Sequence, residues 1–391
     1  MLTNPPTTFA PTLLNGFIKD IDPKNVLLAP FNLEAFSFEG KVATVYSYSL
    51  GIQTKLPFNL VLDTAYVGSL GRHLLQRLNF NPVPYGATFL PQNQDPTKTG
   101  AATLGSNALS QDFLRPYQGF GNINLHQMGG TSNYNSLQTS LNRRFARGLS
   151  IGAAYTWSKA LTTVSGDGTF IRIDSNTRKG NYGPADFDRR HTLAINYVYE
   201  FPHLARFGNH ELTRALFDGW QVSGITFFQS GQPYDVGFSI PGIGSPNLTG
   251  SYTEGARIKL IGNPLTGTSN DPYNRLNPAA YTLPPVGGIG LDAPVRYLKR
   301  PGINNWDMSL QKTFAFKERA RLELRADAFN VFNHTQFNGI NSTLNFTSLT
   351  NATPTNLYLK PDGTINNKNG FGTVSGARDP RILQLVVRLQ F

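Results

Sequence analysis

The chain has 391 residues and a formal net charge of +11, and only 15% of its positions are charged while 12% are aromatic. An average soluble domain carries about 25% charged residues, so this composition, with 38 glycines and 26 prolines, favours many strands joined by turns over helices. Cysteine is absent, which excludes thiol catalysis, disulfide bonds and cysteine-ligated zinc.

Apolar and polar residues alternate along much of the chain, which is the period of strands with one buried face. Residues 149–157 show the pattern well, with Leu, Ile, Ala, Tyr and Trp at odd positions and small or polar residues at even ones. The alternation predicts nine strands, which are, in chain order, residues 44–56, 60–69, 133–145, 149–161, 189–201, 219–230, 304–314, 320–331 and 381–391.

The length of these strands and of their connections favours a membrane barrel. Globular strands centre on about five or six residues, whereas a tilted transmembrane strand needs about 9 to 11. Short turns follow the first, third and seventh strands, and a medium link covers 202–218. Long segments occupy 70–132, 162–188, 231–303 and 332–380. Outer-membrane barrels combine short periplasmic turns with long extracellular loops, so we predict an all-β transmembrane antiparallel barrel portion with long extracellular loops.

Strand parity bears on the organisation of the chain. Nine strands is an odd number, and closed bacterial barrels normally have an even one. Either a tenth strand lies within residues 1–40, or the chain is the C-terminal piece of a larger barrel. Residues 1–17 lack the basic start and apolar run of a secretory signal, which favours the piece. We therefore expect 1–40 to be a loop or a remnant of a preceding barrel segment and 41–391 to be the C-terminal part of the barrel.

Five stretches together resemble a known family. They are SLGIQTKLPFNLVLDTAYVGSLGRHL (49–74), NYNSLQTSLNRRFARGLSIGAAYTWSKAL (133–161), GPADFDRRHTLAINYVYEFP (183–202), GWQVSGITFFQSGQPYDV (219–236) and NNWDMSLQKTFAF followed by LELRADAFNVFNHTQFN (304–338). Their order is similar to the C-terminal barrel portion of Oar-like TonB-dependent outer-membrane receptors, the family with a carboxypeptidase-regulatory-like module. The resemblance covers roughly residues 40–391 and implies a barrel of about 22 strands, of which this chain supplies about nine or ten.

The same resemblance implies further parts and partners. Such receptors hold a plug domain inside the barrel and are energised by an inner-membrane TonB complex. This sequence shows no plug-like domain, TonB box or regulatory-like module, so those partners are expected only for a full-length protein. Outer-membrane lipid and the barrel assembly machinery are the other expected partners, and scattered basic pairs without a basic block predict no nucleic acid.

Alternation assigns side chains to the two faces of the predicted wall. Lipid-facing or interfacial girdle positions are Ile151, Tyr155, Trp157, Leu322 and Leu324. Aromatic residues near strand ends are typical of interfacial girdles, although aromatic residues in a sandwich core would give the same pattern.

Four charged residues on one strand should face the barrel interior. They are Arg321, Glu323, Arg325 and Asp327. An Arg facing lipid near the midplane costs about 2–4 kcal/mol, so this face is predicted to line the lumen. It could contact a plug or guide a solute, or be simply a solvated face.

The last strand has a regular apolar pattern that ends on an aromatic residue. Apolar side chains recur at every second position before a terminal aromatic residue: Leu385, Val387, Leu389 and Phe391. This resembles the signal by which the assembly machinery takes up barrel strands; the alternative is an edge strand of a soluble sheet.

Enzyme signatures are weak. GLSIG at 148–152 matches GxSxG, but it begins a strand and lacks the strand-to-helix elbow of a nucleophile. The six histidines have no compact metal-ligand spacing, and the charged cluster from Asp186 to His191 is read as a salt-bridged rim. No catalytic, cofactor-binding or metal residue is predicted.

The predicted function is the barrel segment of an outer-membrane TonB-dependent transport receptor, which forms the membrane wall and ligand-facing extracellular loops of a Gram-negative-type cell. The protein is not expected to be an enzyme. Two alternatives stay open: a soluble or surface-attached β-rich adhesion or glycan-binding protein, and a nonfunctional gene fragment.

Overall fold

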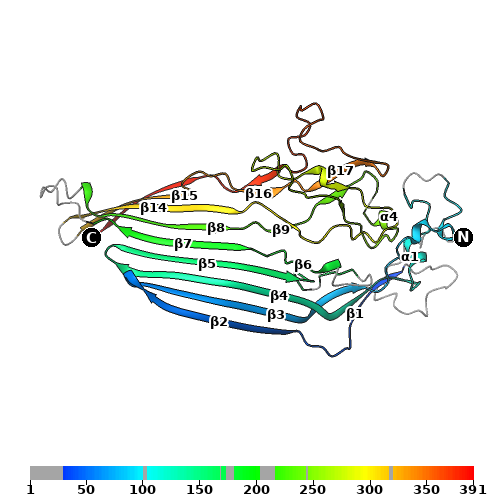
Figure 1. The fold of residues 1–391 in the computed structure, drawn as a ribbon, viewed down its shortest axis with the longest axis horizontal. Coiled ribbons are helices and arrows are strands. Elements are labelled where there is room, and N and C mark those ends of the chain that lie inside the picture. The colour runs from blue at the N-terminus through cyan, green and yellow to red at the C-terminus, as the bar shows by residue number, and fades with distance from the viewer. Residues whose placement is uncertain are drawn as a thin grey trace.

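The computed structural model describes residues 30–99, 104–167, 169–172, 180–202, 216–243, 245–316 and 320–391. Long antiparallel strands run side by side along the molecule (Figure 1). They pair in chain order as β2 (Thr44–Leu56), β3 (Leu60–Asn79), β4 (Phe120–Ala146), β5 (Leu149–Thr162), β7 (His191–Glu200), β8 (Trp220–Gln229), β14 (Ile303–Phe316), β15 (Ala320–Phe329) and β20 (Ile382–Gln390). All nine predicted strands and their antiparallel order are confirmed. The sheet is open, because β2 and β20 each pair with a single long strand within the described residues.

Two strands are longer than predicted, which corrects the expected long loop at 70–132. β3 has 20 residues and β4 has 27, and their outer halves continue to pair up to Asn79 with Asn124. The register shifts between Gly71 and Leu75, and His73 adopts a φ of 53°. This bulge breaks the period-2 alternation, so the sequence pattern ends at the bulge although the strand does not.

An additional strand lies in the segment expected to be a loop or remnant. β1 (Phe31–Phe36) pairs in parallel with the outer half of β4, with Phe36 opposite His126. It therefore lies beside β4 and is not a tenth member of the antiparallel order. Residues 1–29 of the predicted segment 1–40 lie outside the described residues.

The short connections gather at one end of the sheet, near the C-terminus, and the long ones at the opposite end (Figure 1). Between β4 and β5 the turn is Arg147 and Gly148, with φ values of 52° and 78°. Positive φ at both central residues is the type I′ geometry that matches the twist of a two-residue hairpin. A 3₁₀ turn, Pro57–Asn59, connects β2 and β3.

The long connections contain short elements. These are 3₁₀ turns Ala87–Phe89, Pro91–Asn93 and Pro278–Ala280, helices α1 (Gln111–Leu114) and α4 (Ser245–Thr249), and strands β6 (Gly183–Pro184), β9 (Pro233–Tyr234), β10 (Gly237–Ser239), β11 (Lys259–Leu260), β12 (Tyr281–Thr282), β13 (Leu298–Lys299), β16 (Phe337–Ile340), β17 (Thr343–Ser348), β18 (Asn351–Pro354) and β19 (Val374–Ala377). In the described part of the chain, no helix has the length and apolar character needed to cross a membrane.

Segments 231–302 and 332–380 together form what we call the loop body, which has its own hydrophobic core. β10 pairs with β17, β9 with β13 and β16 with β19. Its fully or nearly buried side chains are Tyr234, Val236, Ile240, Leu248, Ile258, Leu276, Ala280, Tyr281, Leu298, Ile340, Leu344, Phe346 and Phe371. The turn-rich sequence thus folds into a packed unit and does not form an extended irregular loop.

Candidate functional site

The strand register sorts the side chains of the long sheet onto two faces. Residues directly opposite each other in an antiparallel pair share a face. One row of such partners crosses all nine strands: Leu56, Leu60, Arg143, Ile151, Tyr197, Gly224, Met308, Ala328 and Leu383. We call this side the apolar face and the opposite side the polar face.

The predicted lipid-facing residues share the apolar face. Ile151, Tyr155 and Trp157 alternate along β5, and Trp157 is 50% exposed. Leu322 and Leu324 join the same face further along the sheet. The register thus places all five predicted residues on one face of the sheet. Their contact with lipid stays a prediction.

The final strand contributes to the same face. β20 pairs with β15 so that Leu389 lies opposite Leu322, Val387 opposite Leu324 and Leu385 opposite Ala326. These side chains and Phe391 are largely exposed. The proposed assembly residues therefore extend the apolar face to the last strand of the sheet.

The predicted lumen-facing residues share the polar face. Arg321, Glu323, Arg325 and Asp327 lie opposite Gln390, Arg388, Val386 and Gln384 of β20. Arg325 Nε donates to Asp327 Oδ2 at 3.1 Å, which makes an ion pair along the strand. Opposite charges therefore alternate along β15, and Glu323 faces one opposite charge, Arg388, across the pair.

Aromatic side chains mark two levels of the apolar face. Trp220 and Phe228 point to this face from β8, eight residues apart, which is about 27 Å along a strand. At the long-loop end the Phe228 and Trp306 ring centroids are 5.8 Å apart. At the short-turn end Tyr199 and Phe201 are 5.0 Å apart. At the strand tilt of about 40° in such barrels this is about 21 Å along the membrane normal, which is close to the height of about 25 Å of an apolar band between two aromatic girdles.

Lys312 places a positive charge on the apolar face, next to two aromatic rings. Its ammonium nitrogen lies 5.2 Å from the Trp220 ring centre and 5.0 Å from that of Phe314. It also donates to the backbone carbonyl of Asp218 at the short-turn end. A lysine can keep its stem on an apolar surface while its charge reaches a polar boundary, so Lys312 marks the end of the apolar band.

The loop body contains an open cavity of about 620 Å3 that the sequence did not predict. Pairing of β9 with β13 puts Tyr234 opposite Leu298, and β16 supplies Ile340. The lining residues are Tyr234, Leu265, Thr268, Ser269, Asn270, Arg275, Tyr297, Leu298, Lys299, Arg300, Pro301 and Ile340. Three are cationic and none is acidic, so we call this the cationic cavity.

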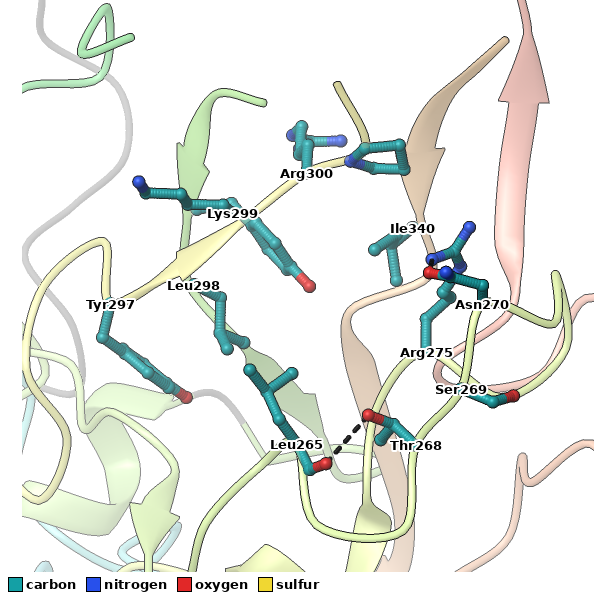
Figure 2. Close-up of a pocket in the computed structure, with 12 residues that line it drawn as sticks. Leu265, Thr268, Ser269, Asn270, Arg275, Tyr297, Leu298, Lys299, Arg300 and Ile340 are labelled. Carbon is teal, nitrogen blue, oxygen red and sulfur yellow. Dashed lines mark hydrogen bonds between the residues drawn. The ribbon is translucent and has the colours of Figure 1, made fainter. Parts of the chain in front are cut away.

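The polar groups of the cationic cavity are arranged on an apolar frame (Figure 2). Arg275 Nη1 donates to Asn270 Oδ1 at 3.0 Å, and the guanidinium carbon of Arg300 lies 5.4 Å from the Tyr234 ring centre. Figure 2 shows Arg275 and Asn270 beside Ile340, with Leu265 and Leu298 across the cavity. The cavity therefore combines guanidinium groups with aliphatic walls.

The two tyrosines of the cavity stay neutral. Burial raises the pKa of the Tyr234 hydroxyl far above its ordinary value. Burial also raises the pKa of Tyr297, whose hydroxyl donates to Tyr281 Oη at 3.3 Å. Both phenols therefore remain uncharged at physiological pH and do not offset the positive charge of the cavity.

Sequence reasoning missed this cavity because its lining residues come from distant segments. The basic pair Lys299 and Arg300 is visible in the sequence, but similar pairs occur elsewhere, such as Arg143 and Arg144. Only the β9–β13 pairing and the packing of 265–275 against β16 bring the lining together.

The expected salt-bridged rim from Asp186 to His191 is wrong in its chemistry. Asp188 is buried, and its Oδ1 accepts from the backbone N–H of Ala160 at 2.7 Å. Arg189 Nε donates to Gln229 Oε1 at 3.3 Å. The cluster thus fixes backbone and amide groups at the sheet rim through hydrogen bonds.

The GLSIG match at 148–152 belongs to a hairpin turn and the strand that follows it. Gly148 forms the hairpin turn with a φ of 78°, and Gly152 lies within β5, where an added Cβ would stand 2.6 Å from Asn196 Oδ1. Among the described residues no group of three or more His, Cys, Asp or Glu side chains could hold a metal ion.

Comparison with known proteins identifies the family. The family model described as outer membrane beta barrel domain matches residues 2–384. The chain belongs to this family. The antiparallel sheet with its single apolar face is therefore an outer-membrane β-barrel wall, and the predicted fold class and outer-membrane location are confirmed.

Several solved structures are similar to this chain at low identity. The outer membrane transporter YddB from Escherichia coli is 12% identical, with a TM-score of 0.39 over 88% of this chain and 32% of that one. The ferripyoverdine receptor of Pseudomonas aeruginosa is also 12% identical, with a TM-score of 0.34 over 88% of this chain and 27% of that one. This chain thus spans about a third or less of their length. No curated protein matches it.

Proposed function

We propose that this chain is the barrel segment of a TonB-dependent transport receptor of the Oar-like type. The observation that supports the proposal most directly is the single register that keeps one face apolar across nine strands. The receptor type rests on the five sequence stretches described above, four of which lie wholly or mainly in the long strands. In this role the chain forms wall and loops and catalyses no reaction.

The orientation follows from the connections. Barrels of the outer membrane place short turns in the periplasm and long loops outside the cell. On that basis the turn at Arg147 and Gly148 faces the periplasm, and the loop body and the outer halves of β3 and β4 face the medium. The polar face, with Arg321 and Glu323, lines the lumen.

The two edge strands of the sheet, β2 and β20, each have one side that pairs with no long strand among the described residues. β2 and β20 are the first and last of nine strands that alternate in direction, so they run in the same direction. An unpaired strand edge in hydrocarbon costs several kcal/mol for each unsatisfied backbone group. We therefore propose that a preceding barrel part with a plug, and through it the TonB complex, completes the receptor.

We propose that the last strand is bound by another protein during barrel assembly. Leu385, Val387 and Leu389 present consecutive apolar side chains on one face, and Phe391 follows the strand. The barrel assembly machinery is the proposed partner for this strand.

The experiment is to express the gene with its upstream sequence, separate membranes, and compare migration of unheated and heated protein on denaturing gels. A barrel receptor is expected in the outer-membrane fraction with heat-modifiable migration. Recovery in the soluble fraction, with identical migration of both samples, would favour the adhesion alternative. Absence of any protein product in the native cells would support the gene-fragment alternative.

A further inference from the structure

We propose that the cationic cavity of the loop body binds an organic anion that has a flat apolar body and a carboxylate or similar acidic group. This inference rests on the proposed receptor function, because it makes the loop body the ligand-contacting part of the chain.

Unmet hydrogen-bond donors are the first argument for an anion. Arg275 Nε is buried and has no hydrogen-bond partner. The Arg300 guanidinium makes a cation–π contact with the Tyr234 ring, and it forms no hydrogen bond or ion pair with any described residue. A guanidinium offers five donors in a planar fork that suits a carboxylate, so the Arg300 guanidinium is available to donate to an acidic ligand.

The sign of the charge is the second argument. Arg275, Lys299 and Arg300 line the cavity without an acidic side chain among the other lining residues. The lining tyrosines are neutral for the reason given above. Lys299 also has Asp188 as an acidic neighbour, whereas Arg275 and Arg300 have no acidic side chain among the lining residues. These two guanidinium groups attract an anion, so a neutral ligand would leave their charge unsatisfied.

The apolar walls are the third argument, and they select the body of the ligand. Leu265, Leu298, Pro301 and Ile340 line the space together with the Tyr234 ring. The cavity volume of about 620 Å3 falls within the roughly 300–1,000 Å3 of small-molecule sites. An inorganic anion would leave these walls in contact with water, whereas an aromatic or polycyclic acid would cover them.

The test uses protein extracted from outer membranes in a nonionic detergent, after heat-modifiable migration has shown that it is folded. Binding of 2-naphthoate is measured by equilibrium dialysis, with protein-free micelles as the blank. The comparison ligands are 2-naphthamide, which keeps the rings without the charge, and acetate, which keeps the charge without the rings. We expect both to bind at least about tenfold more weakly than 2-naphthoate.

Variants place the ligand in the cavity. Arg275→Gln and Arg300→Gln should each weaken 2-naphthoate binding about tenfold or more, since each removes a charged hydrogen-bond donor. Lys360→Gln is the matched control, because it removes one exposed positive charge of the same loop body outside the cavity. Its binding should be unchanged. Arg300→Lys keeps the charge and should recover part of the affinity.

Three results would overturn the inference: equal affinity for 2-naphthoate and 2-naphthamide, an equal loss with Lys360→Gln, or no saturable binding to protein that migrates as a folded barrel. The last result leaves the receptor proposal standing, because folding and location are measured separately. Protein that is absent from the outer membrane would instead contradict the receptor proposal itself.

Discussion

Two neighbouring alanines of β5 allow the two-faced wall to be tested with chemically identical substitutions. Ala153 lies on the apolar face between Leu141 of β4 and Ile195 of β7. Ala154, the next residue, lies on the polar face opposite Ser140 and Ala194. Replacing either one with Arg adds the same side chain to the same strand at nearly the same depth, so only the face differs.

The depth of Ala153 sets the expected magnitude. It lies four residues from Leu149, beside the short turn, and four from Trp157, in the predicted outer girdle. Four residues span about 14 Å of strand, or about 10 Å along the membrane normal at a tilt of about 40°. Ala153 is therefore near the midplane of a band about 25 Å tall, where an Arg facing lipid costs about 2–4 kcal/mol.

We expect Ala153→Arg to shift the folding equilibrium of the membrane-embedded protein by about 30- to 700-fold. Ala154→Arg should change it little, because the polar face meets water or other polar groups. The assay is urea unfolding in lipid vesicles, followed by heat-modifiable migration, with outer-membrane abundance in cells as a second readout. Similar losses in both variants would refute the assignment of the two faces, and a larger loss for Ala154→Arg would reverse it.

Four further outcomes are expected. Ile151→Arg, close to the short turn, should impair insertion less than Ala153→Arg but more than Ser150→Arg, measured as outer-membrane abundance; equal abundance of the Ile151 and Ser150 variants would argue against the barrel face. Phe346→Ala should destabilise the loop body by about 3–5 kcal/mol, because Phe346 is 1% exposed, with faster hydrogen exchange in 231–302 and unchanged migration of the barrel. The hydrogen bond from Asn124, followed by those from His126 and Arg77, lowers the pKa of Glu34 below its ordinary 4.5. The pairing of β1 with β4 should therefore be strongest above pH 4.5 and should weaken as pH falls through the lowered pKa. The measurement is the protection of the β1 amides relative to their intrinsic exchange rate at each pH; protection that is constant with pH in wild type, or that is still lost in acid in Glu34→Gln, would contradict this. Deletion of Phe391 should reduce surface display of the receptor that contains this chain, and wild-type display would count against an assembly role.

The sequence predicts the long strands well because each carries a local and redundant signal. Along 149–161 and 320–331 the period-2 pattern alone marks both the element and its faces, and the register joins those faces as expected. The turn at Arg147 and Gly148 is equally local. Such features need no information about the rest of the chain.

The remainder depends on contacts between distant residues. The outer halves of β3 and β4 were missed because the bulge at His73 shifts the alternation. β1 was missed because its pairing with β4 is parallel and joins segments about 90 residues apart, as in Glu34 with Asn124. The cationic cavity requires packing among four segments of the loop body, which no local pattern records.

The central claim is that the nine strands form a membrane wall with one face to lipid and the other to the lumen. Because the chain has no cysteine, single cysteines can be placed at each position from 150 to 157 of β5 and spin-labelled without background. Accessibility to oxygen, which concentrates in lipid, and to a water-soluble nickel chelate can then be measured in membranes. The claim predicts a period-2 alternation, with Ile151, Ala153 and Tyr155 exposed to oxygen and Ser150, Gly152 and Ala154 exposed to the chelate. Uniform accessibility along the strand, or alternation in the opposite phase, would contradict it.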